Sequence, residues 1–195
     1  MRAFPENILK LYNQALSLKN QGKAQEAYNQ CEIILQSYPT YSLALQLEGI
    51  IFAEIKDYPR SLECFTKAIK HDRKNAACYS NRGNVYQSTK QYDLALSDFN
   101  RAISIKHDFV EAHYNKGNCY KEMNDYPKAI ESYVRTLFYN PAYADAYTNM
   151  GTCHQNLQQF DKSLECYNQA IELDPKNWMQ YNNKGYSLHV LSLIH

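Results

Sequence analysis

Residues 110–143 read VEAHYNKGNCYKEMNDYPKAIESYVRTLFYNPAY, and this stretch decides the fold. Its apolar and small residues recur every three or four positions in two runs: Tyr114, Gly117, Tyr120 and Met123, then Ile130, Tyr133, Val134 and Leu137. That spacing places each run along one face of an α-helix. Between the runs, residues 124–127 supply a turn, and their proline suits the start of the next helix. The stretch therefore predicts a helical hairpin.

The same pattern recurs every 34 residues along the chain. Five of the six glycines keep this interval: Gly49, Gly83, Gly117, Gly151 and Gly185. One interval before the first of them stands Ala15, the next smallest residue. A larger packing residue recurs in the same rhythm: Cys31, Phe65, Phe99, Tyr133 and Tyr167. Because a glycine inside a helix costs about 1 kcal/mol relative to alanine, its recurrence predicts that paired helices approach closely at this position.

The unit resembles the tetratricopeptide repeat, which has a small residue at position 8, tyrosine near 11 and 17, alanine at 20, an aromatic residue at 24 and proline at 32. The resemblance covers nearly the whole chain and implies an all-α fold, a right-handed α-solenoid of helix-turn-helix repeats. It implies these segments: a lead-in at 1–7, five repeats at 8–41, 42–75, 76–109, 110–143 and 144–177, and a sixth first helix or capping helix at 178–195. The first repeat departs from the pattern because it lacks the glycine and the aromatic residues.

Composition limits the function classes. Lys and Arg number 21 against 20 Asp and Glu, a net charge of +1, which argues against a nucleic-acid partner or a basic membrane-binding surface. No apolar run approaches the length of about 18 residues that a membrane span needs, so no membrane insertion is expected. Six cysteines without a Cys-x-x-Cys motif are typical of buried thiols in a reducing compartment, and they favour a cytoplasmic location.

The sequence contains no pattern typical of a catalytic or metal site. No pair among the six histidines has the ligand spacing of a zinc site. Phosphate-binding loops, nucleophile motifs and paired carboxylates are also missing. We therefore expect no enzyme activity from this chain alone, no cofactor and no bound metal.

The resemblance implies that the first helix of each hairpin lines a concave groove, where positions 2, 5, 6, 9, 12 and 13 face a ligand. Positions 6 and 9 hold the candidate peptide-binding residues: Asn81, Asn84, Asn115, Asn118, Asn149 and Asn183. A carboxamide has both a donor and an acceptor, so it can hold a peptide amide at two points. The row is similar to the asparagines in the superhelix of O-linked N-acetylglucosamine transferase. The alternative is that these are solvated side chains of a chain rich in asparagine.

The corresponding positions of the first two repeats are apolar: Leu9, Tyr12, Leu16, Leu43, Leu47 and Ile50. An apolar surface of this size is expected to be covered. Its occupant is an amphipathic helix of a partner, residues 1–7 of this chain, or a second copy of the chain. A partner or a homodimer mate is the favoured interpretation.

These features predict a protein–protein interaction scaffold that binds an extended peptide or partner segment, as a subunit of a larger complex. The alternative is the substrate-recognition arm of a larger enzyme such as a glycosyltransferase. A receptor for chaperone C-termini is not expected, because Asp145 stands where such a site needs a cation. Apolar residues near the chain end, Leu188, Val190, Leu191 and Leu193, predict that this helix continues into a longer protein or docks against a neighbour.

Overall fold

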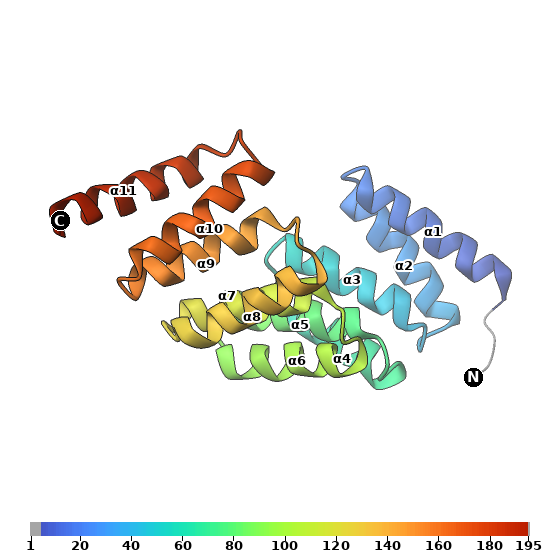
Figure 1. Ribbon diagram of the computed structural model, residues 1–195. Coiled ribbons are helices and arrows are strands. Elements are labelled where there is room, and N and C mark those ends of the chain that lie inside the picture. Colours follow the sequence, from blue (N-terminus) through green and yellow to red (C-terminus); the bar gives the residue numbers. More distant parts are fainter. Residues whose placement is uncertain (1–4, 195) are drawn as a thin grey trace. The chain divides into compact units, whose positions relative to one another are not determined.

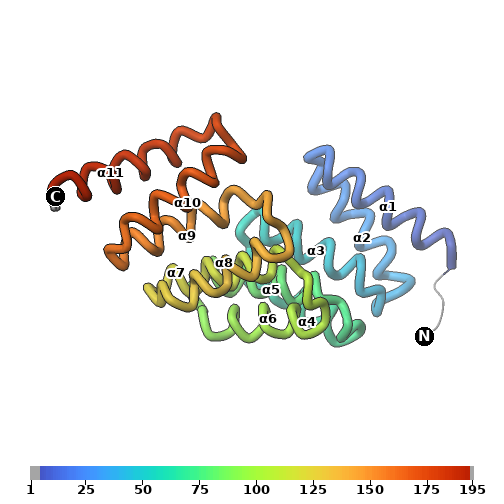
Figure 2. Tube along the Cα trace, in the orientation of Figure 1, coloured from blue at the N-terminus to red at the C-terminus, as the bar shows by residue number. Residues whose placement is uncertain are grey.

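A computed structural model describes residues 5–194, and this part of the chain is helical throughout, without a strand (Figure 1). The helices are α1 (Glu6–Asn20), α2 (Ala24–Ser37), α3 (Ser42–Glu54), α4 (Tyr58–His71), α5 (Ala76–Ser88), α6 (Tyr92–Ile105), α7 (Val110–Glu122), α8 (Tyr126–Tyr139), α9 (Ala144–Asn156), α10 (Phe160–Leu173) and α11 (Trp178–Ile194). Short turns join them, and each helix turns back along the one before it, as the tube through α9, α10 and α11 shows (Figure 2). The predicted all-α class is confirmed.

The chain divides into two compact units, Met1–Ile105 and Lys106–His195. The first unit contains the hairpins α1–α2, α3–α4 and α5–α6, and within it α2 packs on α3 and α4 packs on α5. The second unit contains α7–α8, α9–α10 and the single helix α11, with α8 packed on α9 and α10 packed on α11. Each unit is thus a stack of hairpins in which the second helix of one hairpin contacts the first helix of the next.

Side-chain caps and prolines explain where several helices begin. The carboxylate of Asp57 accepts a hydrogen bond from the backbone N–H of Arg60 at 3.3 Å, and Asp125 does the same for Lys128 at 3.3 Å. Both caps satisfy a backbone donor that the first turn of a helix leaves unpaired. A proline lies in the first turn of both α4 and α8, where its missing N–H costs nothing. The predicted turn and proline entry at residues 124–127 are confirmed.

The turn inside each hairpin requires one residue with a positive φ. These residues, each 34 apart, are Gly22, Lys56, Lys90, Asn124 and Gln158. Gly22, with a φ of 79°, adopts this conformation without a steric cost. The other four residues have φ between 59° and 61°, which for a residue with a Cβ costs roughly 1–2 kcal/mol.

The recurring glycines lie where the two helices of a hairpin touch. A Cβ atom added to Gly49, Gly83, Gly117 or Gly151 would lie 2.8, 2.7, 2.6 or 2.8 Å from the aromatic ring sixteen residues later. No side chain fits in that space, so the predicted close packing is confirmed in these four hairpins. Gly185 differs, because a Cβ there would meet nothing within 4 Å.

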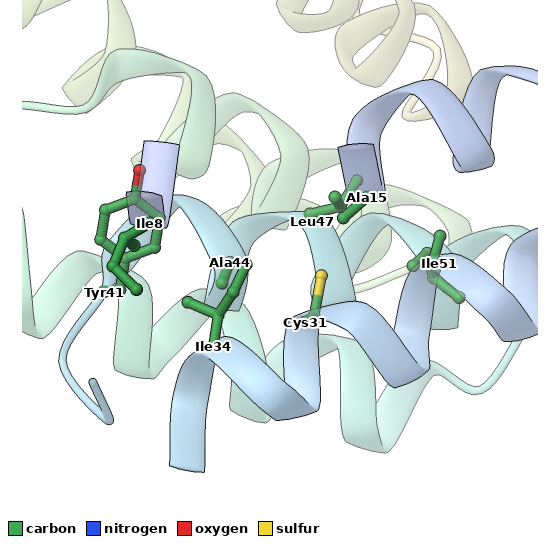
Figure 3. Close-up of a cluster of buried hydrophobic side chains, with 9 residues drawn as sticks. Ile8, Ala15, Cys31, Ile34, Tyr41, Ala44, Leu47 and Ile51 are labelled. Atoms are coloured by element: carbon green, nitrogen blue, oxygen red, sulfur yellow. The ribbon is translucent and has the colours of Figure 1, made fainter. Parts of the chain in front are cut away.

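In the first hairpin, α1–α2, this contact contains no aromatic ring. Ala15 and Cys31 replace the glycine and the ring, and both are completely buried. Figure 3 shows them in one cluster with Ile8, Ile34, Tyr41, Ala44, Leu47 and Ile51. The larger alanine and the smaller cysteine fill the space that glycine and an aromatic ring fill in the other four hairpins.

All six cysteines are buried free thiols, as predicted from their positions: Cys31, Cys64, Cys78, Cys119, Cys153 and Cys166. Burial raises the pKa of Cys31, Cys64 and Cys78 to about 12. It raises the pKa of Cys153 and Cys166 to about 11. These thiols therefore stay protonated and unreactive near neutral pH.

Candidate functional site

The candidate asparagines are half-buried and lie on the first helices of their hairpins. Asn81 and Asn84 lie on α5 in the first unit. The others belong to the second unit, and their positions are Asn115 and Asn118 on α7, Asn149 on α9 and Asn183 on α11. Their hydrogen bonds separate them into different groups.

In the second unit two asparagines are joined in a network of internal hydrogen bonds. Asn149 donates from Nδ2 to the hydroxyl of Tyr114 at 2.9 Å and to Oδ1 of Asn118 at 3.1 Å. Its Oδ1 accepts a hydrogen bond from Nζ of Lys121 at 2.8 Å. Oδ1 of Asn118 also accepts from the Tyr133 hydroxyl at 2.8 Å. This Asn118–Asn149 network connects α9 to α7, and it uses both ends of the Asn149 carboxamide.

Lys121 is a member of this network that the sequence interpretation missed. Its ammonium group is largely withdrawn from water, and this burial lowers its pKa. The Asn149 carbonyl oxygen gives the ammonium an acceptor without a second charge. Lys121 stands at position 12 of its repeat, one of the positions that the family resemblance predicts to face a ligand. A lysine at that position does not by itself predict that its ammonium group is bound by an asparagine of the next repeat.

The network reveals how first helices of neighbouring hairpins contact each other. Asn149, at position 6 of its repeat, contacts positions 5 and 9 of the preceding repeat, namely Tyr114 and Asn118. In the first unit Leu47 occupies position 6 and is buried in the core cluster. Tyr12 and Leu16, at positions 5 and 9 before it, pack partly buried against that cluster. The slot between first helices is apolar between α1 and α3, and it is lined by amides between α7 and α9.

The predicted apolar wall of the first two repeats is therefore used largely for internal packing. Leu47 is buried, and Tyr12, Leu16 and Leu43 are partly buried against the same cluster. Leu9 differs, because its side chain is exposed on α1. Residues 1–7 are the segment of this chain that could cover the wall. Of these, Glu6 and Asn7 lie in α1, and residues 1–4 lie outside the described residues.

Asn81 occupies the same slot in the first unit with different neighbours. The residue at position 9 of the preceding repeat is Ile50, which has no polar group in its side chain. Position 5 is Gln46, whose Oε1 accepts a hydrogen bond from Asn75 at 2.8 Å. The Asn81 carboxamide makes no hydrogen bond with any residue that the structure describes. Among residues 5–194, Asn183 is likewise without a hydrogen-bond partner for its side chain.

A pocket of roughly 250 Å³ opens beside Asn81. It lies within the first unit, and its lining comes from α3, α4 and α5: Ile50, Ala53, Glu54, Tyr58, Phe65, Asn81, Asn84, Val85 and Ser88. We call it the Asn81 pocket. Aliphatic and aromatic side chains supply much of the lining, while Glu54 at the edge is paired with Lys19 at 2.7 Å. The pocket thus combines apolar surface with one carboxamide that has no hydrogen-bond partner among residues 5–194.

The described part of the chain offers no site for metal chemistry. Across residues 5–194, no three His, Cys, Asp or Glu side chains are grouped so that they could hold a metal ion. None of the helices described there is both long enough and apolar enough to cross a membrane.

Comparison with known proteins identifies the repeat. A family model described as tetratricopeptide repeat matches residues 76–109, 110–143 and 144–177, and a second model of the same description matches 11–41. No curated protein matches the chain in sequence.

Solved structures similar to this chain are repeat proteins of the same fold. MamA from Desulfovibrio magneticus RS-1 is 20% identical, with 90% of this chain and 99% of that chain covered and a TM-score of 0.78. YrrB, described as a TPR protein with an unusual peptide-binding site, is 22% identical, with 90% of each chain covered and a TM-score of 0.73. PilF from Pseudomonas aeruginosa is 15% identical, with 97% and 92% covered and a TM-score of 0.82. At these identities the similarity is one of fold.

Proposed function

Because the chain belongs to the tetratricopeptide repeat family, we propose that it is a non-enzymatic scaffold that binds an extended segment of a partner protein on the first helices of its hairpins. The scaffold acts as a subunit of a larger complex. This family's fold is a surface for protein partners, and YrrB, of similar fold, is described as having a peptide-binding site. The observation that carries the proposal is the Asn81 pocket.

An extended segment can satisfy both parts of this pocket at once. One apolar side chain of the segment enters the space beside Ile50 and Val85 and leaves water. The neighbouring backbone amide then meets the Asn81 carboxamide, which supplies one donor and one acceptor. Since Asn81 has no hydrogen bond to give up within the described protein, the bond to the ligand is a net gain of about 1 kcal/mol.

The remaining candidate asparagines contribute unequally in this proposal. Asn183 has no described partner and resembles Asn81 in this respect. Asn118 and Asn149 must exchange internal hydrogen bonds for bonds to a ligand, so their net contribution to binding is small. Asn84 and Asn115 each have an interaction within the protein and assist the binding of a segment that Asn81 anchors.

Single alanine substitutions test this division. A binding peptide is first selected from a displayed random library against the full chain, and its affinity is then measured by calorimetry. We expect Asn81→Ala to weaken binding by about fivefold or more and to leave the free energy of unfolding unchanged. Asn149→Ala should instead lower the free energy of unfolding by roughly 1–2 kcal/mol, because it leaves Lys121 without its acceptor.

The matched control is Asn13→Ala. Asn13 also stands at position 6 of its repeat, but it is exposed on α1, so its loss should change neither binding nor stability. Peptide affinity that stays the same in the Asn81→Ala variant would refute the proposed anchor. A peptide that loses affinity equally in all three variants would do the same.

A further inference from the structure

The slot beside Asn81 has a counterpart two repeats later, where a lysine of the protein reaches the asparagine. Asn81 corresponds to Asn149, and Ala53, which lines the Asn81 pocket, corresponds to Lys121. Nζ of Lys121 donates a hydrogen bond to Oδ1 of Asn149 at 2.8 Å. The two slots therefore differ in a respect that matters for a ligand, because the lysine of the second unit is an alanine in the first.

A lysine at position 12 makes a similar connection in the first repeat. Lys19, at position 12 of α1, reaches α3 and pairs with Glu54 at 2.7 Å. Lys19 and Lys121 thus each join their own helix to the first helix of the following repeat. Ala53 holds position 12 of α3, and its side chain ends at Cβ, so it makes no such connection to α5. The place beside it is part of the Asn81 pocket.

The lining of the pocket suits both parts of a lysine side chain. Ile50, Phe65 and Val85 offer apolar surface, on which the methylene stem of a lysine can pack. Asn81 offers a carbonyl oxygen with two lone pairs, and this oxygen has no partner in the described part of the chain. An ammonium group and a backbone N–H of the ligand can therefore bind to Oδ1 together. A lysine does not compete with the backbone contact proposed above.

The charge at the pocket favours a cation. Among the described residues that line it, Glu54 alone carries a charge. Lys19 contacts Oε1 of Glu54, and the second oxygen of a carboxylate can accept a further hydrogen bond. A ligand ammonium group would thus meet an amide oxygen and a carboxylate. A ligand carboxylate would have to displace Glu54 from Lys19 to gain a cation.

We propose that the Asn81 pocket recognises a lysine of the segment that the scaffold binds. This inference rests on the proposed function and names the side chain that enters the pocket. The stem lies on the apolar lining, and the ammonium group takes the place against Asn81 that Lys121 has against Asn149. The bound segment then supplies the connection between α3 and α5 that Ala53 does not make.

The peptides selected from the displayed library provide the first test. We expect them to contain a lysine, and replacing it with norleucine, which keeps an aliphatic stem without the ammonium group, should weaken binding about tenfold or more. The same replacement should change the affinity for the Asn81→Ala variant by only about twofold, because the main acceptor of the ammonium group is then missing.

Glu54→Gln is the matched variant for the charge. It keeps the shape of the side chain, and the ion pair with Lys19 that it removes is partly exposed, so its effect on stability should be small. We expect it to weaken binding of the lysine peptide by about threefold and to leave binding of the norleucine peptide unchanged.

Ala53→Lys tests the pocket from within the chain, because it provides an ammonium group at the position of Lys121. It should weaken binding of the lysine peptide about tenfold or more. It should also shift the side-chain amide resonance of Asn81 in the NMR spectrum toward that of Asn149. Ala53→Met has a similar length without the charge and should not produce this shift. Circular dichroism should be the same for both variants.

Equal affinity of the lysine and norleucine peptides would overturn the lysine pocket, as would selected peptides without lysine or an Asn81 resonance that Ala53→Lys leaves unchanged. Equal losses from norleucine in the original chain and in the Asn81→Ala variant would place the ammonium group elsewhere. In each of these cases, weaker binding to Asn81→Ala would leave the proposed function intact. Affinity that Asn81→Ala does not change would refute the proposed function and the lysine pocket together.

Discussion

At the scale of single residues, replacing the glycine at position 8 of a repeat is expected to have opposite effects on stability in α9 and in α11. Gly151→Ala places a Cβ 2.8 Å from the buried Tyr167 ring, so we expect the free energy of unfolding to fall by about 1–3 kcal/mol. Gly185→Ala meets nothing within 4 Å and should raise that free energy by about 1 kcal/mol, because alanine favours the helix. Urea unfolding of both variants measures the difference. Changes of the same sign would contradict the role of the glycines in packing.

A second residue-scale prediction concerns the buried carboxyl of Glu48. Its Oε1 has no hydrogen-bond partner among the described residues, and Oε2 accepts a weak bond from the Cys64 thiol at 3.8 Å. Burial, together with the nearby Glu32 carboxyl, raises the pKa of Glu48 to about 8. The folded state therefore holds a proton that the unfolded state releases near the ordinary value of 4.5.

The free energy of unfolding therefore falls as the pH rises from about 4.5 to about 8. The contribution of Glu48 is fully present below pH 4.5 and disappears above about 8. We expect the free energy of unfolding to fall by about 2 kcal/mol between about pH 6 and about pH 9. Glu48→Gln keeps the shape without the charge, and its stability should vary much less over this range. Equal pH dependence in the two proteins, measured by urea unfolding, would assign the effect to another group.

At the scale of elements, α5 and α6 are held together by a buried ion pair. Arg82 and Asp98 are mostly withdrawn from solvent, and Arg82 also donates to the hydroxyl of Thr66. Asp98→Asn would leave the guanidinium charge without its carboxylate. We expect a loss of about 3–5 kcal/mol in the free energy of unfolding.

The double substitution Arg82→Met with Asp98→Leu separates the charge from the shape. It removes both charges and retains much of the volume, so it should recover most of the stability that Asp98→Asn loses. Chemical denaturation of the three proteins checks this. A double variant no more stable than Asp98→Asn would show that packing, rather than the unpaired charge, causes the loss.

The hairpins themselves could be predicted from the sequence, because a small residue in the first helix and a large residue in the second helix recur together in every repeat. A small residue followed at a fixed distance by a ring is visible without coordinates, and the structure places the two in contact. The surface was less predictable. Val134 was expected in an apolar stripe but is exposed on α8, since spacing alone does not define how wide the covered face of a helix is.

The partners of the asparagines depend on their neighbours and not on their own identity. Asn149 finds Tyr114, Asn118 and Lys121 within reach, while Asn81 stands opposite an isoleucine. Because both residues occupy position 6 of their repeats, the sequence predicts the same role for them. Contacts between different repeats, which the pattern within one repeat does not contain, distinguish the two.

At the scale of the whole molecule, the cysteines report on the two compact units. Each unit contains three buried thiols: Cys31, Cys64 and Cys78 in the first, and Cys119, Cys153 and Cys166 in the second. A buried thiol reacts only when the structure around it opens. We expect negligible labelling by a thiol reagent in the native state, and two groups of three with separate rates at moderate denaturant concentration.

Mass spectrometry of peptides from the labelled protein assigns each rate to its cysteine. A control with Cys166→Ala should lose one label from the slower or faster group without changing the other. One common rate for all six thiols would show instead that the 195 residues open as a single cooperative body.

The matched pairs at the helix crossing also limit how such a protein can evolve. Ala15 fits Cys31, and the glycine at the crossing of each of the next four hairpins fits a ring, so the two halves of a hairpin are inherited as a matched set. A genetic crossover within a hairpin that joined the helix of Ala15 to one with Phe65 would force a methyl group into the ring, and the reverse crossover would leave a void. Duplications and exchanges that preserve folding therefore have their breakpoints in the turns between hairpins, where no such pair is divided.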